Sequence, residues 1–213
     1  MSRALKRDID GPDWRVPVES LRAPGVEKLF APELDASVPL VVDIGFGRGE
    51  FLLDLAGQQP QVAFLGIEYS FKRVLKLARR LERTELRNVR LIEAPAQLLV
   101  GELLPEESLS CVWINFPDPW PKKRHHRRRL VQAEFMRALA KCLRREGEVH
   151  IATDHAEYAE QIGEVLSAEP LLENLYAPEP YLREVSERTP TAYEREWREQ
   201  GRDLHFFGYR RRA

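Results

Sequence analysis

From residue 39 onward, short apolar runs alternate with stretches in which apolar residues recur at helical spacing. The runs are five or six residues long, which is the usual length of a strand, and turn-forming residues separate them from the amphipathic stretches. The predicted strands cover residues 40–44, 62–67, 88–92, 109–114, 148–153 and 204–209. The predicted helices cover residues 50–56, 70–83, 130–143 and 154–166.

This alternation of strands and helices predicts an α/β fold. The runs are nearly continuous in apolar residues, as expected for strands that are buried on both faces. Strands of this kind form a mostly parallel sheet with helices on both faces. We therefore expect residues 39–213 to form one Rossmann-like domain.

Residues 1–38 follow a different pattern. Their prolines, at positions 12, 17, 24 and 32, prevent long regular elements, although a short amphipathic piece around residues 26–30 fits. We expect this segment to form an N-terminal arm that covers part of the domain.

Composition places the chain among soluble globular proteins, with 43% hydrophobic and 31% charged residues. No apolar stretch is long enough to span a bilayer, and the first residues lack the apolar core of a signal peptide. Cys111 and Cys142 have no zinc-ligand spacing and are expected to be buried thiols. We expect a cytoplasmic protein with no membrane and no metal partner.

Charge is distributed unevenly along the chain. The net charge is −1, yet residues 122–129 contain six Lys or Arg residues, so the remainder is acidic. A concentrated cationic run on an otherwise acidic protein predicts a localised phosphate-binding surface. The three arginines at 210–212 are expected to form a solvated tail.

A glycine-rich turn follows the first predicted strand, with the spacing G-x-G-x-G at Gly45, Gly47 and Gly49, preceded by Asp43. Glu68 ends the second strand, where a carboxylate can accept both hydroxyls of a ribose. A pyrophosphate would avoid the added carboxylate, whereas the sulfonium and ammonium of S-adenosyl-L-methionine favour it. We therefore predict S-adenosyl-L-methionine rather than NAD. The alternative is an α/β domain that binds no nucleotide and uses its glycines for packing.

Asp118 follows the fourth strand and lies between Pro117 and Pro119, which fix it on a stiff, non-helical backbone. The cationic run begins at Lys122. A rigid acid beside a dense basic strip predicts chemistry on a polyanion, in which the cations hold phosphates. The alternative is a proline-rich turn that leads into a solvated basic segment.

The stretch 115–129, with its F-P-D-P-W-P-K-K-R-H sequence, resembles the signature of the tRNA (guanine-N7-)-methyltransferase family of the bacterial TrmB type. The turn at 43–49 and the strand end at 66–68 resemble the first two motifs of that family. Residues 153–158 resemble its T-D-x-x-x-Y motif, and residues 188–194 and 201–204 resemble its C-terminal segment. These motifs occur in the family's order and extend over most of the chain.

The resemblance implies a class I methyltransferase fold with an antiparallel C-terminal strand. It also implies methyl transfer from S-adenosyl-L-methionine to N7 of guanine 46 in the variable loop of tRNA, by a monomer or a homodimer. The cofactor site would include Asp43, Gly45, Gly47, Glu68, Pro95, Ala96 and Asp118, with Asp118 also the catalytic residue. The substrate residues would be Lys122, Arg124, Arg127, Arg128, Arg129, Asp154, Thr191, Ala192, Tyr193 and Glu194.

Pro95 departs from the family pattern, which usually has an acid beside the adenine at this position. The backbone N–H of Ala96 can still serve adenine N1, and Gln97 is a possible substitute for the acid. A methyltransferase of another substrate and an RNA-binding module with a vestigial cofactor pocket remain alternatives, and Pro95 favours the second.

Several site residues also have purely structural interpretations. Asp154 has the position of a helix N-cap, and Thr191 and Glu194 have the spacing of a capping box. Trp120 is a packing aromatic or a platform on which a base stacks.

Overall fold

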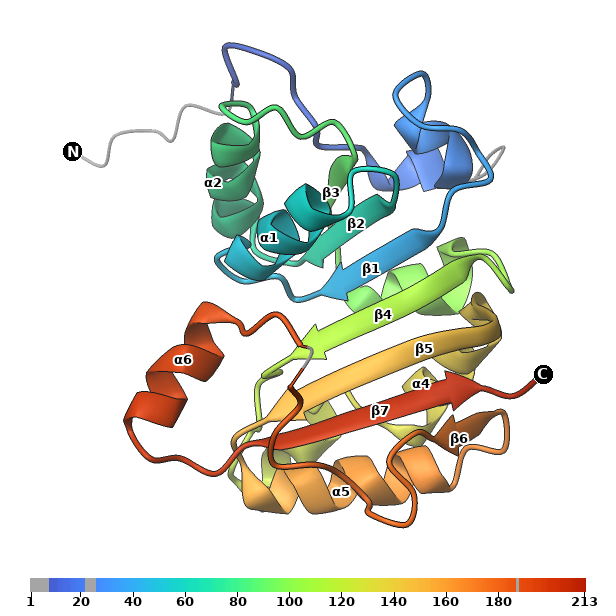
Figure 1. The fold of residues 1–213 in the computed structure, drawn as a ribbon, viewed down its shortest axis with the longest axis vertical. Coiled ribbons are helices and arrows are strands. Elements are labelled where there is room, and N and C mark those ends of the chain that lie inside the picture. Colours follow the sequence, from blue (N-terminus) through green and yellow to red (C-terminus); the bar gives the residue numbers. More distant parts are fainter. Residues whose placement is uncertain (1–7, 22–25, 187) are drawn as a thin grey trace.

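The computed structural model describes residues 8–21, 26–186 and 188–213. They form one seven-stranded sheet in the order β3-β2-β1-β4-β5-β7-β6 (Figure 1). The strands are β1 (Leu40–Ile44), β2 (Ala63–Glu68), β3 (Val89–Glu93), β4 (Leu109–Asn115), β5 (Leu143–Thr153), β6 (Leu172–Asn174) and β7 (His205–Arg211). The first five strands pair in parallel, and β7 runs antiparallel to β5 and β6. The mostly parallel sheet with an antiparallel C-terminal strand is therefore confirmed.

Helices cover both faces of this sheet. α1 (Glu50–Gln58) and α2 (Phe71–Leu81) lie on the face of β1 to β3 that is toward the viewer in Figure 1. α4 (Ala133–Cys142) packs against β5, and α5 (Ala156–Ser167) packs against β5 and β7, both behind the sheet in Figure 1. The short α3 (Ala96–Leu98) and η3 (Leu99–Leu103) lie on the same rear face, where η3 adjoins α4. Strand order reverses between β1 and β4, so the crevice where an open α/β sheet binds its ligands opens at the carboxyl ends of these two strands.

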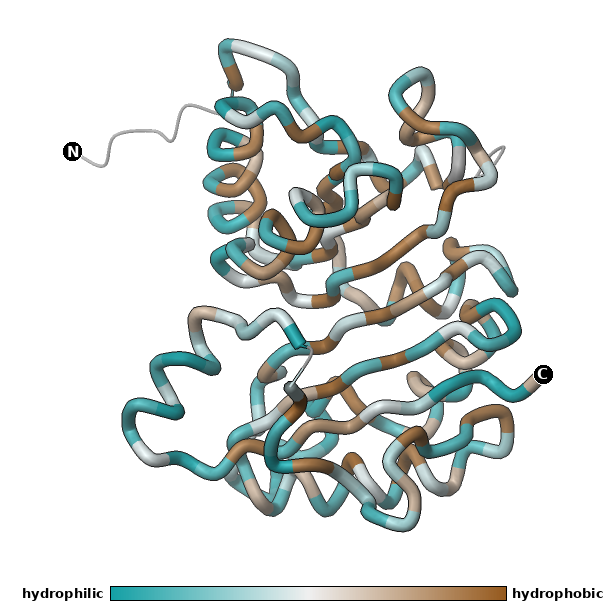
Figure 2. The backbone as a smooth tube through the Cα atoms, viewed as in Figure 1, coloured by the Kyte–Doolittle hydropathy of each residue, from teal (hydrophilic) through white to brown (hydrophobic). Residues whose placement is uncertain are grey.

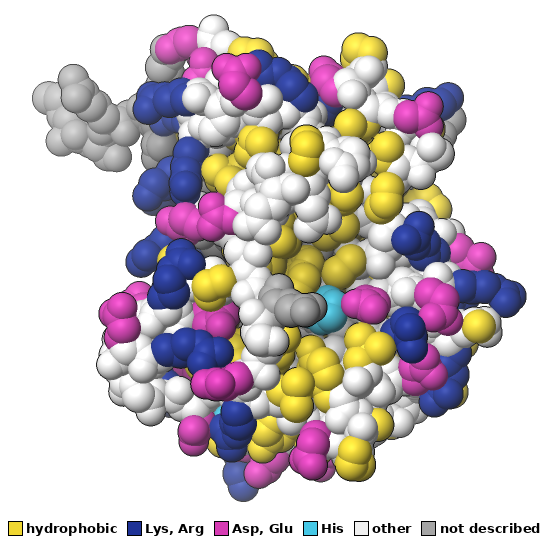
Figure 3. Space-filling model, viewed as in Figure 1, with side chains coloured by type: hydrophobic (Ala, Val, Ile, Leu, Met, Phe, Trp, Pro, Cys, Tyr) yellow, Lys and Arg dark blue, Asp and Glu magenta, His cyan; other side chains and the backbone are white. Residues whose placement is uncertain are grey.

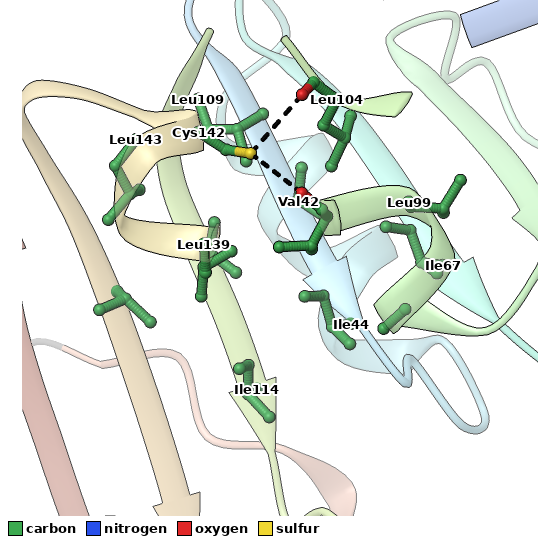
Figure 4. Close-up of a cluster of buried hydrophobic side chains, with 14 of the residues drawn as sticks. Val42, Ile44, Ile67, Leu99, Leu104, Leu109, Ile114, Leu139, Cys142 and Leu143 are labelled. Carbon is green, nitrogen blue, oxygen red and sulfur yellow. Dashed lines mark hydrogen bonds between the residues drawn. The ribbon is translucent and has the colours of Figure 1, made fainter. Parts of the chain in front are cut away.

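Apolar strands account for the core. Figure 2 shows the hydrophobic colour concentrated along the central strands, whereas α2 alternates between hydrophobic and hydrophilic positions. Figure 4 looks into the cluster between the sheet and its rear helices, where Cys142 Sγ donates to the carbonyls of Val100 and Leu104 at 3.5 and 3.6 Å. Burial raises the pKa of the Cys142 thiol to about 11, as expected for a core thiol.

The described part of the segment before residue 39 packs along one edge of the sheet through residues 14–16. Leu91 of β3 exchanges backbone hydrogen bonds with it: Val16 N–H donates to Leu91 O at 2.9 Å, and Leu91 N–H donates to Trp14 O at 3.0 Å. The short helices η1 (Val18–Leu21) and η2 (Val26–Phe30) bury the side chains of Leu21, Val26 and Phe30 in the core. The described part of this segment therefore contributes to the core. The domain boundary at residue 38 stays a prediction.

Two predicted boundaries and the expected tail are corrected. β5 begins at Leu143 instead of residue 148, and α5 begins at Ala156 with His155, not Asp154, as the capping residue. Arg210 and Arg211 belong to β7, where Arg210 pairs with Glu173 at 3.1 Å. These arginines are strand residues with ionic partners, so the expectation of a solvated tail at 210–212 is wrong for both.

Candidate active site

Two adjoining hollows open at the carboxyl ends of β1, β2 and β4, with volumes of about 320 and 470 Å³. They share five lining residues, namely Gly45, Arg73, Asn115, Phe116 and Asp118. The first hollow continues toward the C-terminal segment, and the second continues toward β2 and the start of α3. The fold therefore brings the predicted cofactor turn and the predicted catalytic acid to one cavity.

The glycine turn after β1 forms the floor of this cavity. Gly45 and Gly47 adopt left-handed conformations with φ of 74° and 58°, which glycine reaches without strain. Gly49 also has a positive φ, and a Cβ added there would come within 2.4 Å of the Leu77 side chain. The third glycine therefore allows α2 to pack closely against the start of α1.

Asp43 lies at the end of β1 and is 2% exposed. Among the described residues, its Oδ1 has no hydrogen-bond partner, and neither has Nδ2 of Asn115, which lines the same hollow. Burial raises the pKa of Asp43 to about 7; the cationic Arg188 opposes this rise and Glu68 adds to it. Buried polar atoms are normally satisfied, so this acceptor and this donor indicate a site for a polar ligand.

Glu68 ends β2 and is equally buried. Its carboxylate accepts hydrogen bonds from Ser70 N–H at 3.0 Å, Gly47 N–H at 3.3 Å and Arg73 Nη1 at 3.3 Å. These contacts hold the carboxylate at the cavity wall. A carboxylate has about four lone-pair sites, and these three donors occupy three of them. Two hydroxyls of a ligand can therefore bind only if the Arg73 side chain shares its site or moves away.

The wall beyond Glu68 is formed by the start of α3. Pro95 is exposed at the helix N-cap, Ala96 is buried, and both line the larger hollow together with Gln97. At the position where the family usually has an acid, the side chain that lines the larger hollow is that of Pro95. The position of Pro95 at the cavity is therefore as expected, while its effect on cofactor affinity stays a prediction.

Asp118 is exposed at the mouth of the cavity, on a strained loop. Phe116 and Trp120 on either side have positive φ values of 51° and 44°, which non-glycine residues rarely adopt. Phe116 N–H donates to Ala152 O at 2.8 Å, which ties the loop to the end of β5. Such strain persists only where the surroundings fix the backbone, and it clusters at functional sites.

Arg129 holds the loop that carries Asp118 through a hydrogen bond to its backbone. The Arg129 side chain is 1% exposed, and the guanidinium donates to Pro119 O at 2.7 Å and to Gln161 Oε1 at 2.7 Å and lies over the Tyr158 ring. These donors are occupied inside the protein, so the structure gives Arg129 a supporting role, and its contact with RNA stays a prediction. We assign Arg129 to holding the Asp118 loop in place.

The remaining cations of the run are on the surface. η4 (Lys123–Arg128) has no buried residue, and Lys122, Arg124, Arg127 and Arg128 are exposed. The Arg128 guanidinium lies 5.0 Å from the centre of the Trp120 ring, and His125 meets the edge of that ring. A cationic surface thus begins directly beside Asp118.

The C-terminal segment closes the other side of the cavity through α6 (Ala192–Glu199). Thr191 Oγ1 accepts Glu194 N–H at 2.9 Å, which confirms half of the capping box. The Glu194 carboxylate is buried and pairs with Arg188 and Arg198 instead of completing the box. Ala192 and Tyr193 line the smaller hollow.

Asp154 does not cap the helix that follows it. Its Oδ2 pairs with Nη1 of Arg202 at 3.0 Å, while His155 Nδ1 accepts Tyr158 N–H and caps α5. The interpretation of Asp154 as an N-cap is therefore wrong. A contact between Asp154 and substrate stays a prediction.

Sequence reasoning missed Arg188 as a site residue. Its side chain is 4% exposed, donates to Asn115 Oδ1 at 2.6 Å and to Glu194 Oε2 at 3.1 Å, and lies over three aromatic rings. This buried cation orients Asn115 and lowers the pKa of Asp43 against the effect of burial. The only signal in the sequence is its place at the start of the C-terminal motif.

The chain matches, over residues 37–207, the family model described as "Putative methyltransferase". It is 42% identical over 174 residues to the tRNA (guanine-N(7)-)-methyltransferase of Alkalilimnicola ehrlichii, covering 82% of this chain and 73% of the relative. It is 36% identical over 214 residues to the enzyme of the same name from Halorhodospira halophila, covering 100% and 91%.

The chain belongs to the tRNA (guanine-N(7)-)-methyltransferase family.

The fold of this tRNA (guanine-N(7)-)-methyltransferase family member is similar to the folds of several solved methyltransferase structures. The 16S rRNA methyltransferase KamB has a TM-score of 0.58 at 14% identity and covers 87% of this chain and 92% of its own. The aminoglycoside resistance methyltransferase NpmB1 has a TM-score of 0.56 at 18% identity, with 81% and 87% covered. The class I methyltransferase fold is therefore confirmed.

S-adenosyl-L-methionine is the methyl donor of this family and fold, and the residues of the cavity fit it. The unpartnered Asp43 Oδ1 is an acceptor for a cationic ligand group, and the turn at Gly45 and Gly47 leaves the backbone open to a close approach. Among residues 8–21, 26–186 and 188–213, no helix is long and apolar enough to cross a bilayer. The described residues also contain no group of three or more metal-ligating side chains.

Proposed function

We propose that this protein transfers a methyl group from S-adenosyl-L-methionine to N7 of guanine in tRNA, at guanine 46 of the variable loop. One observation supports this most directly. A cavity with a buried, unpartnered carboxyl oxygen opens next to an exposed acid, Asp118, and the cations of residues 122–128 continue from that acid on the surface. This arrangement supports a proposal in which the methyl donor binds in the cavity, with base recognition and phosphate binding beside it. We further propose that the protein acts in the cytoplasm, where tRNA is its partner.

The cofactor is proposed to lie across both hollows. Asp43 and Asn115 receive the charged and polar groups of its methionyl part, and Glu68 accepts hydrogen bonds from the ribose hydroxyls. The adenine lies between Ile67 and the start of α3, where Ala96 N–H serves adenine N1 and Gln97 takes the place of the acid that Pro95 replaces. Bound S-adenosyl-L-methionine supplies an electrophilic methyl group.

For this reaction the protein mainly has to align guanine N7 with the methyl group and stabilise the positive charge that develops on the base. N7 of guanine has an in-plane lone pair and needs no deprotonation before attack, so no general base is required. Positive charge develops on the purine as the methyl group is transferred. Asp118 is proposed to accept hydrogen bonds from the N1–H and N2–H of the base and to offset this charge, in an orientation fixed by the strained loop.

The remaining site residues are proposed to hold the tRNA. The exposed Lys122, Arg124, Arg127 and Arg128 neutralise phosphates beside the cavity. Asp154, Ala192 and Tyr193 contact the nucleoside from the C-terminal side. Thr191 and Glu194 act indirectly, because one caps α6 and the other anchors Arg188. The base must leave its stack to reach the cavity, so local opening of the tRNA is expected.

Affinity for S-adenosyl-L-methionine should rise with pH through the range in which Asp43 ionises. Because the pKa of Asp43 is raised to about 7, only about a tenth of the carboxyl is ionised one pH unit below that value, and we expect affinity to rise about eightfold between about pH 6 and about pH 7.5. Isothermal titration calorimetry checks this, with Asp43→Asn as the variant that flattens the profile.

The same shift determines how the stability of the ligand-free protein varies with pH. The folded state retains the Asp43 proton longer than the unfolded state does, so the free energy of unfolding should fall between about pH 4 and about pH 7 and then level off. Urea unfolding of the wild type and of Asp43→Asn measures this contribution.

For the binding prediction, wild-type affinity for S-adenosyl-L-methionine that does not vary with pH would show that Asp43 does not face the cation.

Nucleoside analysis of unmodified tRNA, incubated with the protein and S-adenosyl-L-methionine, tests the proposed function. We expect 7-methylguanosine, and a tRNA with guanine 46 replaced by adenine should stay unmethylated. Methylation at another guanine would reject only the position. Methyl transfer to another substrate class, or tRNA binding without any transfer, would reject the reaction.

A further inference from the structure

The outward face of α2 carries a row of cations that the sequence patterns above did not single out. Six of the twelve residues at 72–83 are Lys or Arg, against one acid, Glu82. The apolar residues of α2 face the sheet and are buried, whereas Lys72, Lys76 and Arg83 are exposed. In Figure 3, Lys and Arg side chains gather along the left edge of the view, over α2.

These cations line a groove of about 730 Å³, referred to below as the α2 groove. Six of its nine lining residues are Lys or Arg. Arg48 and Glu50 line both the α2 groove and the smaller hollow of the candidate active site. The cationic surface is therefore continuous with the cavity in which Asp118 lies.

A solvated helix face would ordinarily mix charges of both signs, because opposite charges four residues apart stabilise a helix and like charges destabilise it. In α2 the pairs Lys72–Lys76 and Lys76–Arg80 are both like-charged. Arg80 has one relieving partner, Glu50, at 3.7 Å. Lys72, Lys76 and Arg83 have no ionic partner among the described residues. A row of this kind, left without counter-charges, is typical of a surface that binds a polyanion.

The α2 groove and the basic run lie on opposite faces of the sheet. Residues of the run contact α5, since His126 Nε2 lies 3.6 Å from Glu157 Oε1. α5 packs behind the sheet, whereas α2 covers the face toward the viewer in Figure 1. The carboxyl edge of the sheet, with its cavity, therefore lies between two separate cationic surfaces.

We propose that the α2 groove is a second tRNA-binding surface, which takes the phosphate backbone on the side of the cavity opposite to residues 122–128. This inference rests on the proposed function, because it assigns the groove to the same substrate. A tRNA that straddles the edge of the sheet contacts both surfaces, and the target base reaches the cavity between them. An acidic protein segment fits the charge equally well, but continuity with the candidate active site favours the RNA.

Three neutral substitutions test the inference, Lys72→Gln with Lys76→Gln and Arg83→Gln. The matched control removes the same charge at the start of β5, at the amino end of the parallel strands, where exposed Lys141, Arg144 and Arg145 are each replaced by Gln. We expect the α2 variant to bind a tRNA transcript about tenfold more weakly, with a slope of log K against log salt that is smaller by up to about 0.9 for each phosphate that is no longer neutralised. The kcat at saturating tRNA and the affinity for S-adenosyl-L-methionine should match the wild type.

The control variant should bind tRNA as the wild type does, and circular dichroism should show both variants folded. Unchanged tRNA affinity and salt slope in the α2 variant would overturn the inference and leave the proposed function intact. So would loss of polyglutamate binding in that variant with tRNA binding retained, because the groove would then take an acidic protein. If the wild type forms no 7-methylguanosine, the proposed function fails, and the binding comparison still decides whether the groove contacts tRNA.

Discussion

Asp118→Asn should lower kcat for methyl transfer to tRNA by about 10²–10³-fold, the usual cost of removing one group aimed at developing charge. The substitution keeps the shape of the side chain, removes its negative charge and replaces one acceptor oxygen by a donor NH2. That charge is what offsets the positive charge developing on the purine. The backbone around Asp118 is held by Phe116 N–H and by the Arg129 guanidinium, so the loop should keep its conformation in the variant. Single-turnover transfer from labelled S-adenosyl-L-methionine measures the effect on the chemical step.

The matched control is Glu157→Gln, which removes a carboxylate beside the basic run without touching the cavity. It should leave kcat within a few-fold of the wild type and change only the affinity for tRNA. Asp118→Asn should show the reverse, with the main loss in kcat and little change in the affinity for tRNA, most of which comes from phosphate contacts. Transfer by Asp118→Asn at the wild-type rate would remove this residue from the mechanism.

Arg188→Met should destabilise the protein by about 3–5 kcal/mol, the range observed when one member of a buried ion pair is removed. The Arg188 and Glu194 side chains are 4% and 5% exposed, so water cannot solvate the carboxylate that is left behind. Asn115 Oδ1 would also lose its donor, and Asp43 would lose the cation that lowers its pKa. Urea unfolding measures the change in the free energy of unfolding.

Two further variants separate this effect from a general loss of packing. Arg198→Met removes the outer partner of Glu194, whose side chain is 37% exposed, and should cost no more than about 1 kcal/mol. Combining Arg188→Met with Glu194→Leu should recover much of the lost stability, because the buried carboxylate that loses Arg188 is then removed as well. In Arg188→Met the rise of cofactor affinity with pH should also shift to higher pH, because Asp43 loses the cation that lowers its pKa. Equal stability of the Arg188 and Arg198 variants would contradict the buried network.

The apolar pattern predicted the parallel part of the sheet because those strands are buried on both faces. The strand predicted at 148–153 was too short because Arg144, Arg145 and Glu146, at the start of β5, are exposed and interrupt the apolar pattern. The apolar pattern missed α6 because Glu194 is the only buried residue of that helix, so no apolar stripe marks it. Elements that bury few apolar residues leave no periodic signal in the sequence.

At the site, local motifs placed Asp43, Glu68 and Asp118 around the adjoining hollows because each lies at or just beyond the carboxyl end of a parallel strand, and such strand ends share one edge. The sequence could not separate Arg129 from its neighbours, since the side on which each cation lies depends on how residues 123–128 turn. Arg188 was missed because its partner Asn115 is 73 residues away, and only the folded sheet brings the two together.

The N-terminal segment has a consequence for how the protein behaves at high concentration. β3 is one edge strand of the sheet, and residues 14–16 occupy hydrogen-bonding groups of Leu91 that another chain could otherwise pair with. The opposite edge, β6, is only three residues long. Neither edge therefore offers a long open template for intermolecular β-pairing. A fragment trimmed to the family match at residue 37 would uncover β3 and lose the buried Leu21, Val26 and Phe30, and it would be prone to aggregate through that edge.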